Sequence, residues 1–263
     1  MVEDEAMDGY TNSTYGDAFA DVYDDWYHDV SDAVATVDLV ADLARENADL
    51  PVLELGVGTG RIAVPLASRG VRVVGVDASP AMLAKLAEND PSGLVIGHLG
   101  DMVDGLPGGP FAVVFVAFNT FFNLLDASRQ QACFAAVAAC LAPDGVFMIE
   151  TFVPEPRSGS SVAVRSMTAD TVVLTVATHD DATQTAQGHY VSLSESGGVR
   201  LRPWAIRYAT VEQLDEMAAV AGFRVIERWE DPSRSEFTAE SPRHITVYGT
   251  NHRRVRPEGT PTS

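Results

Sequence analysis

The chain has 263 residues, a net charge of −19 and an apolar fraction of 46%, which is typical of a globular protein with a large core. No segment reaches the roughly 20 apolar residues of a membrane span, and the first 30 residues contain no Lys or Arg, which argues against a secretory signal. The charge disfavours nucleic acid and anionic membrane as partners. Because neither a membrane span nor a secretory signal is predicted, we expect a cytoplasmic protein.

The acidic charge is concentrated in residues 1–49, which hold fourteen Asp and Glu against one basic residue, Arg45. Within this segment the apolar spacing predicts a helix from Asp17, and a second helix over 31–45 with Val34 on its apolar face. We interpret residues 1–49 as an N-terminal arm and helical lid. Its charge is compatible with steering a small cationic substrate such as an amine, or simply with keeping a mobile arm soluble.

Residues 50–155 alternate between strand and helix patterns, which predicts a doubly wound, mostly parallel α/β sheet. Ligands of such sheets bind at the carboxyl ends of the strands. Cys133 and Cys140 lie on an apolar helical pattern and are predicted to be buried thiols rather than a disulfide or a metal site. Strands are expected near 51–55, 71–76, 94–97, 111–117 and 144–151, and helices near 60–69, 79–88 and 127–141.

The pattern changes in residues 156–209, where β-rich stretches separated by turns predict an antiparallel insertion. Residues 210–250 return to the core with a last helix near 211–221 and two edge strands near 223–229 and 244–249, which bring the sheet to seven strands. The tail, residues 251–263, lacks core residues and is predicted to be disordered.

A glycine-rich turn, Glu54-Leu55-Gly56-Val57-Gly58-Thr59-Gly60, joins the first core strand to the following helix. Such a turn presents bare backbone N–H groups at a positive helix end, and glycine lets a ligand approach the backbone closely. Asp77 follows the next apolar run, where a carboxylate can accept both hydroxyls of a ribose, although an Asp there can also simply cap a helix. Together they predict a site for a nucleotide-like cofactor.

The glycines are spaced G-x-G-x-G after an acid, unlike the G-x-G-x-x-G of dinucleotide sites. In this the chain resembles the class I S-adenosylmethionine-dependent methyltransferases, and among them the actinobacterial amino-sugar and lincosamide antibiotic N-methyltransferases. The turn resembles their first motif, Asp77 their ribose acid, and Gly100-Asp101-Met102 their adenine clamp. The resemblance implies S-adenosyl-L-methionine as cofactor. On this basis the predicted cofactor-binding residues are Tyr15, Tyr23, Glu54, Gly56, Gly58, Gly60, Arg61, Asp77, Ala78, Met82, Asp101, Met102, Phe118 and Asn119.

The segment 118–123 resembles the fourth motif of these enzymes but lacks the acidic-Pro-Pro-aromatic form of amide and nucleobase methyltransferases, which argues against nucleic acid as substrate. The N-terminal tyrosines resemble a cap over cofactor and substrate. We found no cluster with metal-ligand spacing, so no metal is predicted. The predicted catalytic residues are Tyr10, Phe118 and His189, and the predicted substrate-binding residues are Phe121, Phe122, Trp204 and Arg207.

The sequence therefore predicts methyl transfer to an amine nitrogen of a small antibiotic or amino-sugar type metabolite, within secondary metabolism. Transfer to a hydroxyl oxygen of a similar metabolite is an alternative. A nicotinamide-dependent oxidoreductase and a non-catalytic cofactor-binding protein are alternatives of other classes. The expected partners are a small-molecule amine and, through the β insertion, further copies of the chain, with neither nucleic acid nor membrane.

Overall fold

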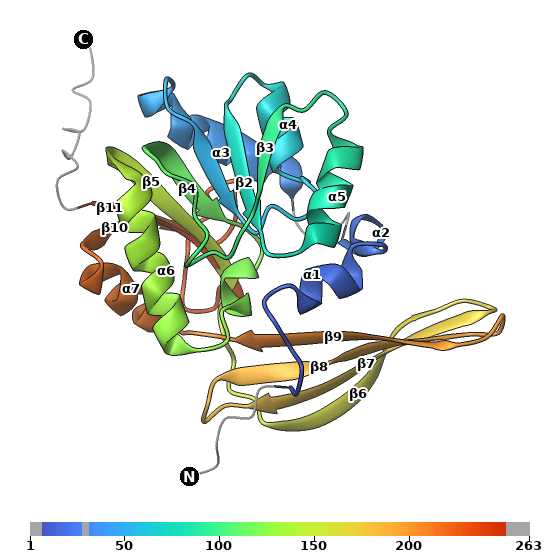
Figure 1. Ribbon diagram of the computed structural model, residues 1–263. Helices are drawn as coiled ribbons and strands as arrows, with labels where there is room; N and C mark the ends of the chain where they lie inside the picture. The colour runs from blue at the N-terminus through green and yellow to red at the C-terminus, as the bar shows by residue number, and fades with distance from the viewer. Residues whose placement is uncertain (1–6, 28–31, 251–263) are drawn as a thin grey trace.

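A computed structural model describes residues 7–27 and 32–250 of the protein, so the predicted disordered tail lies outside the described residues. Its centre is a seven-stranded sheet in the order β10-β11-β5-β4-β1-β2-β3 (Figure 1). Strands β1 to β5 run parallel, and β11 pairs antiparallel with both β5 and β10, as the sequence predicted. The strands are β1 (Val52–Leu55), β2 (Val73–Asp77), β3 (Val95–Leu99), β4 (Phe111–Val116), β5 (Leu141–Phe152), β10 (Phe223–Trp229) and β11 (Arg243–Thr250).

Helices cover both faces of this sheet because successive strand residues point to opposite sides. Val113 packs in the cluster beneath α3, α4 and α5, whereas its neighbour Val114 packs in the cluster beneath α6 and α7. Cys133 and Cys140 of α6 are free and buried, as predicted. The helices are α3 (Ala33–Ala44), η1 (Arg45–Asn47), α4 (Ala63–Ser68), α5 (Pro80–Asn89), η2 (Thr120–Asn123), α6 (Ala127–Cys140) and α7 (Val211–Val220).

Local capping groups fix where several of these helices begin. The Ser79 hydroxyl accepts a hydrogen bond from the Met82 N–H at the start of α5, and the Asp126 carboxylate accepts one from the Arg129 N–H at the start of α6. At α7, Thr210 and Gln213 form a reciprocal capping box. Ser79 thereby sets the position of α5 directly after the end of β2, beside the predicted ribose acid.

The insertion forms a separate four-stranded antiparallel sheet in the order β6-β7-β8-β9. It projects from the carboxyl edge of the core, and the short helix α1 (Thr14–Phe19) packs against both β9 and α5 (Figure 1). The insertion can therefore form one wall of a site at the strand ends. Its strands are β6 (Gly159–Met167), β7 (Thr171–Asp180), β8 (Thr185–Ser194) and β9 (Val199–Arg207).

The arm differs from the predicted single helix, because it forms two short helices, α1 (Thr14–Phe19) and α2 (Tyr23–Tyr27). The guanidinium of Arg202 donates to the Ala18 carbonyl, the acceptor that Val22 would use in a continuous helix. The Val22 N–H instead donates to the Phe19 carbonyl, 2.9 Å away, which tightens the turn. A distant residue thus breaks a helix that the local sequence favoured. In α3, Val34 is 67% exposed, contrary to the predicted apolar face.

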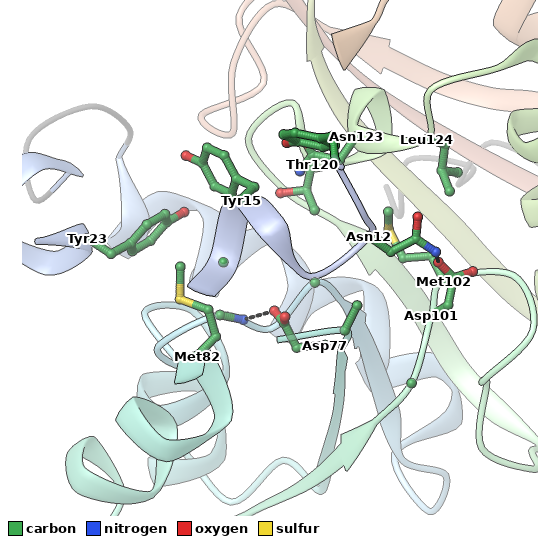
Figure 2. A pocket seen from close by; sticks show the side chains of 16 residues that line it. Asn12, Tyr15, Tyr23, Asp77, Met82, Asp101, Met102, Thr120, Asn123 and Leu124 are labelled. Carbon is green, nitrogen blue, oxygen red and sulfur yellow. Dashed lines mark hydrogen bonds between the residues drawn. The ribbon is translucent and has the colours of Figure 1, made fainter. Parts of the chain in front are cut away.

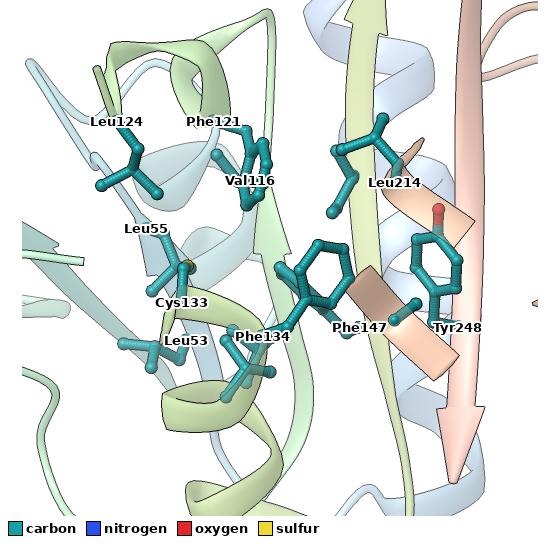
Figure 3. Close-up of a cluster of buried hydrophobic side chains, with 14 of the residues drawn as sticks. Leu53, Leu55, Val116, Phe121, Leu124, Cys133, Phe134, Phe147, Leu214 and Tyr248 are labelled. Atoms are coloured by element: carbon teal, nitrogen blue, oxygen red, sulfur yellow. The ribbon is translucent and has the colours of Figure 1, made fainter. Parts of the chain in front are cut away.

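Phe134 of α6 lies at the centre of the larger core cluster, fully buried, with its ring against Phe121, Phe147 and Tyr248 (Figure 3). Phe134→Ala leaves a cavity that rigid neighbours fill only in part, so we expect the free energy of unfolding to fall by about 3–5 kcal/mol. Urea denaturation measures it. Val34→Ala is the control, since its exposed side chain should change stability by less than about 0.5 kcal/mol, and equal losses for both variants would contradict this assignment of the core.

Candidate active site

A pocket opens at the carboxyl ends of β1, β2 and β3, under the arm (Figure 2). It lies where β1 pairs with β2 on one side and β4 on the other, the switch point at which such sheets bind ligands. We call it the glycine pocket. It is lined by Tyr10, Asn12, Tyr15, Gly16, Tyr23, Gly56, Gly58, Asp77, Ala78, Met82, Gly100, Asp101, Met102, Thr120, Asn123 and Leu124.

The turn after β1 needs glycine for its backbone conformation and for space. Gly56 and Gly58 have φ values of 69° and 55°, in the left-handed region that disfavours a side chain. A Cβ on Gly56 would also overlap the Cγ2 methyl of Thr120, from the segment after β4. The turn can therefore present only backbone to a ligand at this point.

Asp77 ends β2 and faces this turn. Its carboxylate accepts hydrogen bonds from the Gly58 N–H at 2.8 Å and the Ser79 N–H at 2.9 Å. Burial raises the pKa of Asp77, and these two N–H groups act in the opposite direction by stabilising the charged form. Each carboxylate oxygen keeps a further lone pair for a hydroxyl donor. The geometry therefore fits the ribose-binding role that the sequence predicted.

Asp101, after β3, lines the other end of the pocket with Met102. Its carboxylate accepts a hydrogen bond from the Asn12 side-chain amide at 2.7 Å and one from the Val103 N–H at 2.8 Å, and it also pairs with Arg129 of α6. An adenine amino group bound there, as the sequence predicted, would share or replace the bond from Asn12. The arm thus reaches the position expected for the base.

Phe118 and Asn119 follow β4 in a strained turn, with φ values of 49° and 62°. Non-glycine residues keep such conformations only where the surroundings enforce them. The buried Glu150 provides this support, because its Oε2 accepts the Phe118 N–H at 3.2 Å and its carbonyl accepts the Asn119 N–H at 3.0 Å. The Asn119 side chain in turn accepts the Phe152 N–H at 2.7 Å. The turn is therefore a rigid wall beside the glycine pocket.

A second cavity adjoins the glycine pocket and shares Tyr15, Tyr23, Thr120 and Asn123 with it. We call it the aromatic chamber. Its walls come from the arm, from the strained turn and from the inner face of the insertion sheet. It is lined by Tyr15, Tyr23, Tyr27, Phe118, Asn119, Thr120, Asn123, Phe152, Arg165, Tyr190, Trp204 and Ile206.

Acidic residues of the arm hold it over both cavities. Asp17 accepts a hydrogen bond from Ser79, and Asp24 accepts one from Thr59, both at 2.6 Å. Asp21 pairs with Arg202 of β9 through bonds of 2.6 and 2.9 Å. Carboxylates in this acidic segment therefore attach the arm to the core and to the insertion.

The predicted site residues fall into two groups in the structure. Most of the predicted cofactor-binding residues line the glycine pocket, together with Tyr10, whose hydroxyl accepts the Ala205 N–H at 3.2 Å. Phe118, Asn119 and Trp204 line the aromatic chamber. Three predicted cofactor residues lie elsewhere, since Gly60 and Arg61 line a neighbouring hollow and Glu54 is buried, with one carboxylate oxygen lacking a hydrogen-bond partner among the described residues.

Four predicted residues have positions that do not match their predicted roles. Phe121 and Phe122 are fully buried in the core, so they offer no surface to a substrate. Arg207 donates to the side chain of Gln130 at 2.6 Å and does not line the chamber. His189 precedes Tyr190 in β8, and because Tyr190 faces the chamber, strand alternation directs His189 to the opposite side of the sheet.

The sequence analysis missed Asn12, Thr120, Asn123, Arg165 and Tyr190, which the fold brings to the two cavities. Thr120 and Asn123 lie in the segment 118–123. Its resemblance to the fourth methyltransferase motif already marked that segment as part of the site. Asn12, Arg165 and Tyr190 lie in the arm and in the insertion, and no local pattern marks them. Their position depends on how those two segments pack on the core.

Known proteins are similar to this chain in sequence and in fold. Residues 52–145 match a family described as a methyltransferase domain. The solved structure of the CcbJ methyltransferase from Streptomyces caelestis is 39% identical, covers 92% of this chain and 99% of its own, and superposes with a TM-score of 0.84. A cypemycin N-terminal methyltransferase from Streptomyces is 28% identical, over 73% of this chain and 85% of its own length. A dTDP-3-amino-3,6-dideoxy-alpha-D-glucopyranose N,N-dimethyltransferase from Streptomyces fradiae is 27% identical, over 80% and 86%.

Asp77 provides a direct test of the glycine pocket. Asp77→Asn removes the charge that strengthens hydrogen bonds to ribose hydroxyls, so we expect the dissociation constant for S-adenosylhomocysteine to rise about tenfold or more. Isothermal titration calorimetry measures it. Asp170→Asn, on an exposed hairpin of the insertion, is a charge-matched control. An unchanged dissociation constant in Asp77→Asn would refute the ribose assignment.

Proposed function

Because this chain belongs to the class I S-adenosylmethionine-dependent methyltransferases, we propose that its acceptor is an amine nitrogen of a small-molecule metabolite. Two of its relatives are named for methylation of an N-terminus and of an amino sugar. An antibiotic or amino-sugar type metabolite is therefore the acceptor class that we favour. S-adenosylmethionine supplies a methyl group already activated by its sulfonium, so the protein needs to align the acceptor and exclude water.

The glycine pocket fits this cofactor. We assign Gly56 and Gly58 to the close approach of the cofactor to the backbone, Asp77 to the ribose, and Asp101 with Met102 to the adenine. Tyr15 and Tyr23 line both cavities, so they would lie where the cofactor meets the acceptor. Tyr10 closes the pocket from the arm.

The composition of the aromatic chamber favours an amine nitrogen over a hydroxyl oxygen as the acceptor atom. The residues that line it include neither Asp, Glu nor His, so no side chain of ordinary pKa stands ready to take a proton from a hydroxyl. Burial raises the pKa of Tyr27 to about 12 and that of Tyr15 well above its usual value, so both phenols stay neutral. A desolvated amine loses its proton readily, because burial lowers an amine pKa, whereas a sugar hydroxyl holds its proton.

Matched acceptors test this proposal. We expect methyl transfer to the methyl glycoside of a 3-amino-3-deoxyhexose and to alanyl-alanine, but not to the methyl hexoside or lactyl-alanine that carry a hydroxyl in place of the amine. Mass spectrometry of the products, with S-adenosylmethionine as donor, measures it. For the amines, kcat/KM should rise with pH and level off above the acceptor's own pKa, and a less basic amine should shift the profile to lower pH. Transfer to the hydroxyl acceptors would favour O-methylation instead.

We also propose that copies of the chain associate through the outer face of the insertion sheet. Paired residues place Val164, Leu174, Val191 and Leu201 in one row across the four strands, on the face opposite Tyr190. Val164 and Leu201 are 60% and 56% exposed, and apolar surface of this kind on a sheet is typical of an interface. A second copy of the same face would cover it.

Sedimentation velocity tests this association. We expect the wild-type protein to sediment as a dimer or larger species, and Val164→Lys with Leu201→Lys to sediment as a folded monomer that unfolds cooperatively, because both side chains lie outside the core. Val220→Lys, on the exposed side of α7, is the control. A monomeric wild type would exclude the interface.

Among the described residues no helix is long and apolar enough to cross a membrane. A cytoplasmic location and the exclusion of nucleic acid as a substrate stay predictions from the sequence, the latter supported by the net charge of −19.

A further inference from the structure

We propose that Arg165 recognises an oxyanion, a carboxylate or a phosphate, on the acceptor molecule and so selects acidic or zwitterionic amines. Arg165 is the one side chain with a full charge among the residues that line the aromatic chamber. The chamber is therefore positive, although the whole chain carries a net charge of −19. The inference deepens the proposed function and rests on it for the identity of the chamber as the acceptor site.

Strand register places Arg165 on the face of the insertion that turns to the chamber. Ala163, two residues earlier in β6, pairs with Thr175, which pairs with Tyr190, so Arg165 lies on the Tyr190 face. A β-bulge follows directly, since the register with β7 shifts between Val164 and Ser166, and bulges are frequent next to active sites. From this outermost strand of the insertion the Arg165 guanidinium reaches the arm, where it lies 3.4 Å from the Trp26 carbonyl.

Aromatic rings hold the guanidinium in place and leave its edges free for a ligand. The Arg165 Cζ lies 4.8 Å from the ring centre of Tyr190, 4.9 Å from that of Trp26 and 5.6 Å from that of Tyr27. Cation–π contacts occupy no acceptor for the N–H donors, and those donors form a planar fork that matches a carboxylate or phosphate. The hydrogen bond to Trp26 is the one that Arg165 makes to the described residues, and no carboxylate among them pairs with it.

Trp204 gives a second, independent indication that an acceptor oxygen belongs here. It lines the chamber next to Tyr190, with ring centres 6.4 Å apart. Its indole N–H is buried and has no hydrogen-bond partner among the described residues. A buried donor without a partner is unfavourable, and a ligand oxygen would satisfy it. Arg165 and Trp204 therefore line one chamber, to which the described residues contribute no carboxylate.

This arrangement divides the acceptor into two ends. The strained turn with Phe118 and the shared tyrosines adjoin the glycine pocket, so the amine lies at that end. Arg165 does not line the glycine pocket, so the oxyanion lies at the end away from the cofactor. A peptide-like amine with a free carboxylate and an amino sugar linked to phosphate both have this form.

Paired ligands that differ only in the anion test the proposal, and calorimetry on the protein loaded with S-adenosylhomocysteine gives a readout that needs no turnover. The first pair is alanyl-alanine as the free acid and as the carboxamide. The second pair is a 3-amino-3-deoxyhexose as its 1-phosphate and as its methyl glycoside. We expect the anionic member of at least one pair to bind about tenfold or more tightly than the neutral member. The pair that shows the preference identifies the source of the oxyanion.

Variants assign that preference to Arg165. Arg165→Gln should abolish it, so that the two members of the pair bind equally, and Arg165→Lys should restore it only in part, because lysine lacks the planar fork. Trp204→Phe, which keeps the ring, should weaken both members by a few fold. Arg157→Gln is the control, since Arg157 is exposed in the linker before β6 and lies outside the chamber.

The outcomes separate this inference from the proposed function. Equal binding of acid and neutral members, no binding of either, or a preference that survives in Arg165→Gln would overturn the role of Arg165. Methyl transfer to hydroxyl acceptors rather than amines would overturn the proposed function, while the anion preference measured by calorimetry would still stand.

Discussion

The guanidinium of Arg202 joins the arm to the insertion, and the site depends on this contact. The side chain is 4% exposed, donates to the Ala18 carbonyl and pairs with Asp21. It also lies 5.5 Å from the ring centre of Trp26. A buried cation is costly unless it is paired, so the arm has to present a carboxylate and a carbonyl at this place. This contact ties the arm to the insertion, while the bonds of Asp17 to Ser79 and of Asp24 to Thr59 tie it to the core, and together they fix the roof of both cavities.

The two cavities are built in different ways. The glycine pocket rests on the ends of parallel strands, whose positions are set by the sheet ladder and by a core that packs on both faces. The aromatic chamber is assembled from the arm, the turn after β4 and the insertion, so small changes in any of them change its shape. This division suits a transferase that keeps one cofactor and adapts to different acceptors, because the cofactor side is rigid and the acceptor side is formed by added segments.

The acidic arm and the aromatic chamber beneath it also differ in charge. The acidic arm carries most of the net charge of −19, yet Asp17, Asp21 and Asp24 use their carboxylates to bind the core and the insertion. The chamber beneath that arm is lined by aromatic and amide side chains and by Arg165. The overall charge of the protein is therefore a poor guide to the charge of the molecule that the chamber accepts, since distant charges are screened by salt whereas Arg165, although exposed, lies at the chamber itself.

The sequence by itself determined the parts that depend on near neighbours along the chain. The strand–turn–helix around Gly56 and Gly58, the acid Asp77 at the next strand end, and the antiparallel insertion all follow from local periodicity and from the conformational demands of glycine. The mostly parallel sheet with its antiparallel edge pair followed as well, because strands that alternate with helices favour such a sheet, whereas the order of its strands came from the structure. These features were visible before any contact between distant residues was known.

Only the tertiary structure decided the rest, because it depends on residues far apart in sequence. Arg202 breaks the first helix from 184 positions away, and Glu150 supports the turn at Phe118 from 32 positions away. Packing of α6 turned Phe121 and Phe122 into core residues, and strand register put Tyr190 rather than His189 in the chamber. The pairing of β6 with β7 put Arg165 on the chamber face, where it meets Trp26 of the arm across 139 positions of sequence. Periodicity predicts that an element forms, whereas the face that it turns to a site is set by register and by long-range contacts.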